Sequence, residues 1–555
     1  MKLRLLPLAL AAAAIVPASA SATPHWSAPT EVIPSPGAEV FGNSAPEALV
    51  AGGRSLVAAG SAERALLARG NAANVFDTPI NVATAPSGSV GLDAATAPDG
   101  SVAVAWAASG SGHVSLVSPG GSVLSQADLP GAGVNAIGVG IASDGSTIVA
   151  YRTKESKNSY SLRVATAAPG SATFGEPVSL ETTAATDSID VATGPDGAAA
   201  IAYRKLVGKY RARVAVRPAG AAAFEPGQPM TTNGDLDDFT PQVAFDGDGS
   251  LVAAWGNPAG AQYALRPAGA GASFGAGVAL GAGAAFSVDL AATPSGAAAV
   301  AIAGDGRVRA AVQSGPGGAF GEPAQVGESY VSQITATAAV TTQPSGPTTV
   351  VYGNPVDGAV HAADLGGSDQ IIGYGGKDAQ TPVSVDSGSD RTVATWTTGT
   401  GDVVAATRSE SAKPATPADL GPKPAGRDTR PPRLRYASGT KRFAVTSKTK
   451  TLKLKVRCDE KCKLFVTGSL RTQLSAKARR KIAPLPAVKT KKFAAGTQTV
   501  TLKFGGLAQK DLRDALRRGR GGQLFLVVEA YDASGNGART RVQLTVKPAT
   551  KKSRR

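Results

Sequence analysis

Few residues of this 555-residue chain have the types and spacing that chemistry requires. Its two cysteines, Cys458 and Cys462, flank three residues that we expect to form a hairpin loop. Opposed positions of an antiparallel pair lie about 5 Å apart at Cα, which is within the range that a disulfide bridges. In an exported chain we therefore predict a disulfide, closing a ring worth about 2 kcal/mol. The alternatives are free thiols or a metal pair, although no histidine lies near the cysteines.

Catalytic and cofactor motifs are missing from the sequence. His25, His113 and His361 lie in separate contexts, and none belongs to an HExxH motif or has ligand spacing. No GxSxG elbow, Walker loop or Rossmann fingerprint stands between a predicted strand and a helix. We therefore predict no catalytic residue, no metal site and no cofactor.

Three patterns could bind ligands but are better explained as structural. Asp246, Asp248 and Gly249 resemble the start of a calcium loop, yet they occupy an ordinary turn of a repeat. Three arginines at the start of third strands could surround an anion, although such residues usually form a solvated face: Arg163, Arg213 and Arg309. Six aromatic residues could stack on sugars, but their fixed place at a strand end favours packing: Trp106, Tyr151, Tyr203, Trp255, Tyr352 and Trp396.

The element that positions these residues is repeated eight times between Ala48 and Ala405. Each copy has an apolar run, a Pro-Asp-Gly type of turn, a second apolar run that ends on an aromatic, and a third strand-like run. The turns recur every 44 to 52 residues, at Gly53, Gly100, Gly145, Gly197, Gly249, Gly296, Gly346 and Asp390. Because a four-stranded propeller blade needs about this length, we predict an all-β fold with an eight-bladed β-propeller. Seven blades is the alternative, since the Gly53 copy is degenerate.

A fourth strand is indicated in most copies by an aromatic residue shortly before a proline, as in Phe76 and Pro79. The same phrase occurs once without a preceding copy, at residues 26–29. We expect this N-terminal segment to complete the last blade. Residues 414–420 are the alternative donor.

The N-terminus predicts export. Residues 1–22 combine Lys2 and Arg4 with an apolar stretch over residues 5–16 and small residues up to Ala22. This pattern is typical of a secretory signal peptide, and the stretch is too short for a membrane span. No later segment has 18 consecutive apolar residues, so we predict a secreted or envelope-associated protein without a transmembrane segment. The excess of Ala and Gly, with 67 glycines, suggests a GC-rich genome and therefore a bacterial source.

The charge is divided between two parts of the chain. Residues 428–555 hold 33 Lys and Arg against 7 Asp and Glu, a net charge of +26, whereas residues 1–427 have a net charge of −10. A proline-rich linker separates the two parts and should act as a semi-rigid spacer. We predict a propeller over residues 23–410, a linker over 411–432, a second β domain over 433–548 and a basic tail over 549–555.

The second domain reads as six strands and one helix. The strands are expected at residues 433–436, 451–458, 462–467, 498–504, 523–531 and 538–546, and the helix at 507–518 with Leu507, Leu512, Ala515 and Leu516 as its buried stripe. The entry Asp428, Thr429, Arg430, Pro431, Pro432 and the late turn 532–536 resemble bacterial immunoglobulin-like modules. That resemblance implies a β-sandwich used for adhesion, spacing or stabilisation. The basic insertion at residues 471–492 departs from the pattern and leaves the strand order between 467 and 498 open.

The repeats are similar, less specifically, to secreted propellers grouped with sialidase-like proteins. An Asp-box places an aromatic three residues after its glycine, whereas the gap here is six residues, so sialidase chemistry is not carried over.

We expect a binding or scaffolding protein whose propeller presents a ligand face and whose basic domain holds an anionic envelope polymer or glycan. The expected polyanion contacts are Arg479, Arg480, Lys481, Lys489, Lys491 and Lys492. A propeller glycoside hydrolase is the first alternative. Nucleic-acid binding through the basic domain is the second, and export and the few aromatics of that domain argue against it. The sequence predicts neither the ligand nor the oligomeric state.

Overall fold

The computed structural model describes residues 24–34, 46–60, 64–71, 75–84, 89–156, 159–171, 173–182, 188–194, 197–231, 236–269, 271–281, 283–292, 296–328, 337–343, 346–354, 358–375, 381–421, 432–438, 441–472, 481–490, 494–532 and 537–549. The predicted signal peptide at residues 1–22, residues 422–431 of the predicted linker and residues 550–555 of the predicted basic tail therefore lie outside the described residues.

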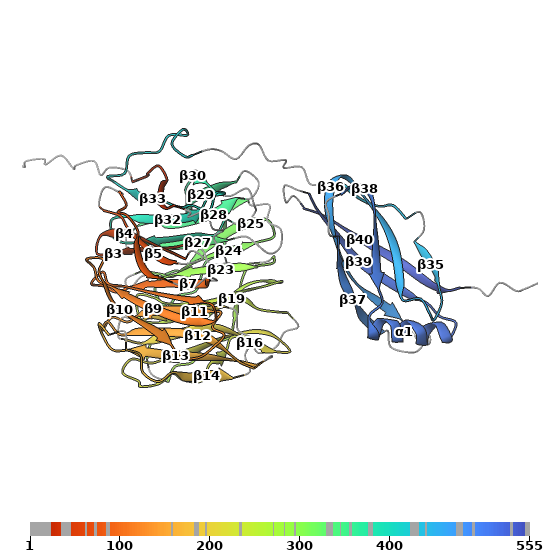
Figure 1. Ribbon diagram of the computed structural model, residues 1–555, viewed down its shortest axis with the longest axis horizontal. Coiled ribbons are helices and arrows are strands. Elements are labelled where there is room, and N and C mark those ends of the chain that lie inside the picture. Colours follow the sequence, from red (N-terminus) through yellow and green to blue (C-terminus); the bar gives the residue numbers. More distant parts are fainter. Residues whose placement is uncertain are drawn as a thin grey trace, which may run out of the picture.

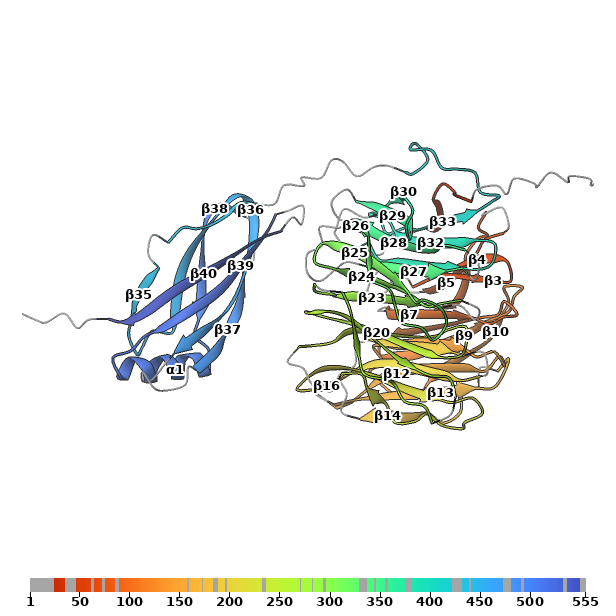
Figure 2. The same cartoon turned by 180° about the vertical axis from the view of Figure 1, so that it is seen from behind.

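The first part of the chain is a β-propeller of eight antiparallel sheets, as the repeats predict (Figures 1 and 2). Blade 1 comprises β3 (Glu47–Ala51), β4 (Arg54–Gly60), β5 (Arg64–Arg69) and β6 (Ile80–Thr84). Blade 2 comprises β7 (Ser89–Thr96), β8 (Val102–Ala108), β9 (Ser111–Val117) and β10 (Val123–Leu129). Blade 3 comprises β11 (Ile137–Ile141), β12 (Thr147–Ser156), β13 (Ser159–Ala167) and β14 (Val178–Thr182). Blade 4 comprises β15 (Ile189–Thr193), β16 (Ala199–Val207), β17 (Lys209–Arg217) and β18 (Gln228–Pro229).

The remaining four blades repeat this order. Blade 5 comprises β19 (Phe239–Phe245), β20 (Leu251–Asn257), β21 (Gly260–Arg266) and β22 (Val278–Leu280). Blade 6 comprises β23 (Ser287–Ala291), β24 (Ala299–Gly304), β25 (Arg307–Val312) and β26 (Ala324–Glu328). Blade 7 comprises β27 (Ala338–Thr342), β28 (Thr348–Asn354), β29 (Ala359–Asp364) and β30 (Asp369–Tyr374). Blade 8 comprises β31 (Val383–Ser387), β32 (Thr392–Thr397) and β33 (Val403–Ser409), completed by β1 (His25–Trp26) and β2 (Thr30–Ile33).

The first strands of neighbouring blades contact one another around a complete ring, from β3 through β31 and back to β3. These strands therefore surround the central channel, and the fourth strands lie at the outside.

The second strand of each blade explains how blades pack. In β8 all seven residues are buried. Val102, Val104 and Trp106 pack against blade 1, whereas the small residues Ala103 and Ala105 pack against blade 3. A sheet that is buried on both faces has this composition, and the pairing of a large face with a small face sets how closely the blades approach.

Ring closure uses the N-terminal segment, as predicted. His25 and Trp26 pair with Ser409 and Arg408 of β33, and the main-chain nitrogen of Ser27 donates to Thr407 O at 2.8 Å. Residues 414–420, the alternative closing segment, lie next to this strand without replacing it, since the nitrogen of Ala415 donates to Trp26 O at 3.1 Å. The chain start and the chain segment after blade 8 are thus joined at one sheet.

The C-terminal part is one curled sheet of seven strands and one helix. The strands are β34 (Leu434–Tyr436), β35 (Arg442–Val445), β36 (Thr451–Thr472), β37 (Lys481–Lys489), β38 (Ala494–Lys503), β39 (Gly522–Asp532) and β40 (Gly537–Pro548), and the helix is α1 (Gly506–Arg517). The sheet order is β34-β36-β39-β40-β35, with β37 and β38 paired with β36. The helix lies at one end of this sheet, against β36 and β37 (Figure 1).

This arrangement changes three expectations. The immunoglobulin-like sandwich is not confirmed, because all seven strands belong to a single sheet around one apolar core. The basic insertion contributes β37, which pairs with the second half of β36. In the helix, Ala508, Leu512 and Ala515 are buried, but Leu507 is 70% exposed, so its place in the buried stripe was wrong. The helix begins at Gly506, and Leu507 in its first turn points away from the core.

Within the described residues, no helix has the length and apolar character needed to cross a membrane.

Candidate functional site

Four carboxylates lie at the same level of the central channel. Glu47, Asp93, Asp190 and Asp289 stand on the first strands of blades 1, 2, 4 and 6. Each pairs with an alanine at the equivalent point of its second strand, namely Ala58, Ala105, Ala202 and Ala301. Electrostatic repulsion from the three aspartates reaches Glu47. The propeller symmetry therefore brings these carboxyls together, and we call them, with Asp386 of blade 8, the channel carboxylates.

The channel aspartates tie neighbouring blades together. The Oδ2 atoms of Asp93, Asp190, Asp289 and Asp386 each accept a hydrogen bond of 2.7 Å from a main-chain nitrogen of the next blade. The donors are Val139, Val243, Val340 and Val50. These nitrogens lie on first strands, which have no further strand on the channel side, so the aspartates satisfy donors that would otherwise lack a partner in the sheet.

The channel also changes the acidity of these groups. Burial among the first strands raises the pKa of Asp93, Asp289 and Asp386 to about 6, and burial with repulsion from other aspartates raises the pKa of Asp190 to about 7. Burial and the three aspartates raise the pKa of Glu47 to about 8. Desolvation disfavours the charged form, and no basic group is among the causes that act on these carboxyls.

Carboxyls with raised pKa values can serve as general acids, but the aspartates here are held by the main chain. Oδ1 of Asp93 accepts from the nitrogen of Ala94 at 2.9 Å, and Oδ1 of Asp386 accepts from Ser387 at 2.8 Å. Both oxygens of these two side chains therefore have structural partners. Glu47 instead accepts from the Ser384 hydroxyl at 3.2 Å.

The third-strand arginines do not join the channel carboxylates. Arg163 pairs across the sheet with Tyr151 and forms an ion pair with Glu155 at 3.0 Å. Arg213 pairs with Tyr203 and lies 3.7 Å from Glu181. Arg309 pairs with Ile302 in blade 6. Because each arginine stays beside the second strand of its own blade, the three do not form one anion site.

The six repeated aromatics pack between blades, as expected. Each is at most 3% exposed. Trp106 stacks on His113 with ring centroids 5.3 Å apart, and Tyr352 stacks on His361 at 5.0 Å. The histidines at these third-strand positions thus extend the packing of the aromatics, and no sugar-stacking surface results.

A polar cavity of about 470 Å³ opens beside the closure of the ring. It is lined by Pro24, Gln343, Pro347, Ser389, Asp390, Arg391, Arg408, Ser409, Glu410 and Ser411. Arg391 forms an ion pair with Asp390 at 2.7 Å, and Arg408 forms one with Asp364 at 2.8 Å. Both guanidinium groups are therefore already neutralised by carboxylates.

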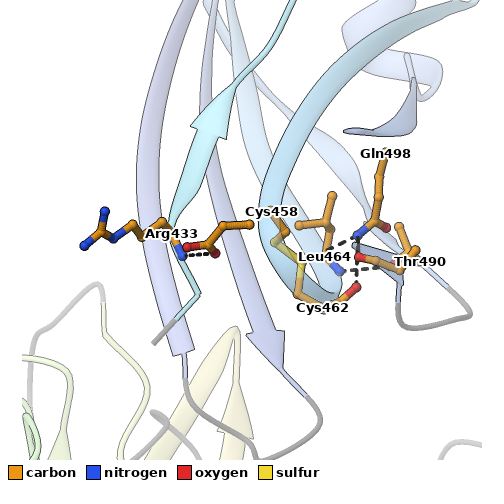
Figure 3. Close-up of a disulfide and its surroundings, with 8 residues drawn as sticks. Arg433, Cys458, Cys462, Leu464, Thr490 and Gln498 are labelled. Atoms are coloured by element: carbon orange, nitrogen blue, oxygen red, sulfur yellow. Dashed lines mark hydrogen bonds between the residues drawn. A yellow bond between two sulfur atoms is a disulfide. The ribbon is translucent and has the colours of Figure 1, made fainter. Parts of the chain in front are cut away.

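The cysteines form the predicted disulfide, but not across a hairpin (Figure 3). Residues 459–461 are a bulge within the continuous strand β36, whose pairing with β38 stops at Cys458 and resumes at Cys462. Their Cα atoms lie 6.5 Å apart. The Gln498 side chain donates to Cys462 O at 3.0 Å, and the Thr490 hydroxyl accepts from the nitrogen of Leu464 at 2.8 Å. The disulfide therefore closes a bulge that side chains of the neighbouring segments also hold.

A row of positive charge lies on the outer face of the curled sheet. On β36, the exposed residues Lys453, Lys455 and Arg457 alternate with buried Leu452, Leu454 and Val456. Arg435 of β34 lies directly opposite Arg457, and exposed Lys503 of β38 pairs with Thr451 at the start of the row. We call Arg435, Lys453, Lys455, Arg457 and Lys503 the basic face.

The basic face has no acidic partner among the described residues. An ion pair of this domain joins Lys481 to Asp511 at 3.5 Å, away from the face. Asp459, the next exposed position on β36, accepts from the main-chain nitrogen of Arg433 at 2.6 Å. Directly opposed like charges destabilise a strand pair, so the arrangement of Arg435 and Arg457 favours binding of an anion there.

The predicted polyanion residues are placed only in part. Lys481 begins β37 and Lys489 ends it, and both are exposed. Arg479, Arg480, Lys491 and Lys492 lie outside the described residues. The residues of the basic face were missed, although an alternation of basic and apolar residues from Leu452 to Cys458 was available as the signal.

No family model matches this chain, and no curated protein sequence matches it. Among solved structures, a polysaccharide lyase of a family described as ulvan lyase, bound to an oligosaccharide, aligns with 9% identity and a TM-score of 0.41, covering 59% of this chain and 92% of its own. The SapL1 lectin in complex with α-methyl fucoside aligns with 11% identity and a TM-score of 0.33, covering 59% and 95%. The β-propeller domain of the Trilobed protease from Pyrococcus furiosus aligns with 9% identity and a TM-score of 0.36, covering 59% and 99%. The assignment of this chain as an eight-bladed propeller rests on its own sheets and ring closure.

Proposed function

We propose that the protein is a secreted or envelope-associated binding protein whose C-terminal sheet holds anionic polymers. The observation that carries the proposal is the basic face, five exposed cations on three adjacent strands without an acidic partner among the described residues. The propeller, with its net negative charge, would then serve as the platform for ligand recognition.

The geometry suits an extended polymer better than a small anion. Alternate residues of a strand are roughly 7 Å apart, so Lys453, Lys455 and Arg457 present charges in a line. Thr497, Thr499 and Thr501 lie beside this line on β38 and offer hydroxyl groups. A chain of phosphate, sulfate or carboxylate groups can follow such a row, and each contact adds a charge-assisted hydrogen bond.

The first prediction tests the basic face in the full-length mature protein. Replacing Lys453, Lys455 and Arg457 together by glutamine should markedly lower the salt concentration needed for elution from a sulfated polysaccharide column. Exposed charges are screened beyond about 8 Å at physiological salt. The dependence of binding on salt should also become shallower by roughly one unit of slope for each lost contact.

A matched control removes the same charge from exposed positions elsewhere in the domain: Lys510, Arg513 and Arg520, each replaced by glutamine. This variant should elute close to the wild type. Equal losses in both variants would show that net charge alone drives retention and would contradict the assignment of the basic face as a site.

A further inference from the structure

The hairpin turn of blade 5 differs from the other turns at one residue. In blades 2, 3 and 5 the same hydrogen bonds close the turn: an aspartate accepts at Oδ1 from the serine nitrogen two residues later, at 2.7 to 2.8 Å. The aspartates are Asp99, Asp144 and Asp248. The residue two positions before this aspartate is Ala97 in blade 2 and Ala142 in blade 3, but Asp246 in blade 5. Asp246 is therefore not needed to form the turn.

Asp246 has the surroundings of a cation ligand. It is 0% exposed, and its Oδ1 atom has no hydrogen-bond partner. Its Oδ2 atom accepts from the nitrogen of Gly317 at 2.5 Å. A buried carboxylate oxygen without a partner costs free energy, so the position implies a positive charge that the protein itself does not provide.

Further oxygen atoms meet at the same place. The carboxyls of Asp246 and Asp248 both reach Gly317, so two acceptor groups meet at one place, and a shared proton or a cation would satisfy both. Asp248 Oδ2 and the Ser250 hydroxyl both lie against Gly317, where an added Cβ would come within 2.6 Å of the first and 3.3 Å of the second. Gly317 has φ +67°, so the blade 6 loop approaches this cluster at a position that a larger residue would block.

We propose that Asp246 and Asp248 bind a calcium ion at the turn of blade 5, beside the loop of blade 6 that contains Gly317. Calcium takes six to eight oxygen ligands and accepts irregular geometry. Two carboxylates and the Ser250 hydroxyl supply part of this set, and water and main-chain carbonyls supply the rest. Asp248 is exposed, so the ion can enter from solvent. The turn of blade 5 is thus both a structural hairpin, closed by Asp248, and a ligand site through Asp246.

The test uses the full-length mature protein, treated with a chelator and then titrated with calcium chloride. Isothermal titration should show binding, and the midpoint of thermal unfolding should rise by on the order of 3 °C at a hundredfold excess of calcium over Kd. Asp246→Ala should abolish both responses and should fold, because blades 2 and 3 carry alanine at this position of the same turn. Asp144→Asn, which changes the equivalent of Asp248 in blade 3, should keep both.

Asp248→Asn is a second test variant, at an exposed position, and it should also lose the response to calcium. The proposal is overturned if the wild type shows neither a heat of binding nor a shift of the unfolding midpoint when calcium is present in millimolar concentration and in at least tenfold excess over the protein. It is also overturned if Asp246→Ala retains the response. It is overturned equally if calcium has no effect while acidification stabilises the wild type more than Asp246→Ala, since the two carboxyls would then share a proton only.

Discussion

The channel aspartates show how a single side chain can replace a missing strand. The inner edge of each first strand has no neighbouring strand on the channel side. The aspartates of blades 2, 4, 6 and 8 accept hydrogen bonds from main-chain nitrogens on this edge of blades 3, 5, 7 and 1: Asp93, Asp190, Asp289 and Asp386. Their charges are poorly hydrated there and lie near one another. Protonation of part of the group relieves the cost of burying these charges near one another, whereas the main-chain hydrogen bonds themselves favour the ionised form.

This gives a second prediction, on the pH dependence of stability. Unfolded Asp and Glu titrate near pH 4, whereas Asp190 and Glu47 titrate at about 7 and about 8 in the folded protein. The folded state thus holds more protons between pH 4 and 8, and the stability of the propeller should fall as pH rises through this window. Thermal unfolding measured from pH 5 to 8.5 should show the decline.

Asp190→Asn keeps an acceptor for the nitrogen of Val243 but cannot ionise. It should unfold at a temperature roughly 2 °C above that of the wild type at pH 8 and close to it at pH 5. Asp99→Asn, at an exposed turn, is the control and should leave the pH profile unchanged. A wild-type profile that rises from pH 5 to 8 would contradict the inferred sign.

The spacing of the channel aspartates was a signal in the sequence that the predictions did not use. Asp93, Asp190 and Asp289 each stand seven residues before the turn glycine of their copies, a periodic signal for one level of the channel. Asp386 and Glu47 depart from that spacing, and their place follows only from the strand register. Asp246 was visible in the sequence, but its buried, unpartnered oxygen depends on the loop of blade 6, which lies 71 residues away.

Among the elements, the two-residue strand β1 makes several of the contacts that close the ring. Trp26 is 5% exposed and packs with Trp396 and Ile372 in the core between blades 7 and 8. Its main chain bonds to β33 on one side and to Ala415 on the other. The two residues of β1 therefore hold the ring and the segment that follows it.

The third prediction concerns this strand. Trp26→Ala should destabilise the propeller by about 3 to 5 kcal/mol, the usual cost of removing a buried large aromatic, because the cavity weakens closure of the last blade. His25→Ala, at the exposed neighbour on the same strand, should cost little. Chemical denaturation of both variants measures the difference, and equal stabilities would show that β1 is dispensable.

Strand existence followed from apolar periodicity, whereas strand continuity did not. The two cysteines and the polar residues between them have the form of a hairpin loop, but β36 continues through them as a bulge. The reason lies in the partners: β38 pairs with the strand on both sides of the bulge, and β39 pairs from Cys462 onward. Local sequence does not reveal such long-range pairing, and for the same reason β37 within the basic insertion was not expected.

For the whole molecule, the division into two units is clearest in the charge. An acidic propeller and a basic sheet attract different partners. At low salt the acidic propeller itself would compete with an anionic polymer for the basic face. The proline-rich stretch between them keeps the two units as separate binding modules in our proposal.

The fourth prediction tests this division by limited proteolysis. Trypsin cuts poorly at a Lys or Arg that precedes a proline. Within residues 412–430, Lys413, Lys423 and Arg430 each precede a proline, whereas Arg427 precedes Asp428. Trypsin should therefore cut first after Arg427 and yield two stable fragments, identified by mass spectrometry. Early cleavage inside several blades would contradict two independently folded units.

The closure of blade 8 has a kinetic consequence. Ser27 and Thr407 exchange hydrogen bonds across 380 residues, so the first strand to emerge during synthesis must wait for the last blade before it can pair. The entropic cost of closing so long a loop grows only with the logarithm of its length, and the finished ring loses little stability by it. Folding rate, in contrast, falls as contacts become more distant in sequence. Until β33 appears, strands β1 and β2 have no partner in a sheet and remain available to other chains. The interval between emergence of Trp26 and of Thr407 is therefore the period in which this protein is most exposed to aggregation.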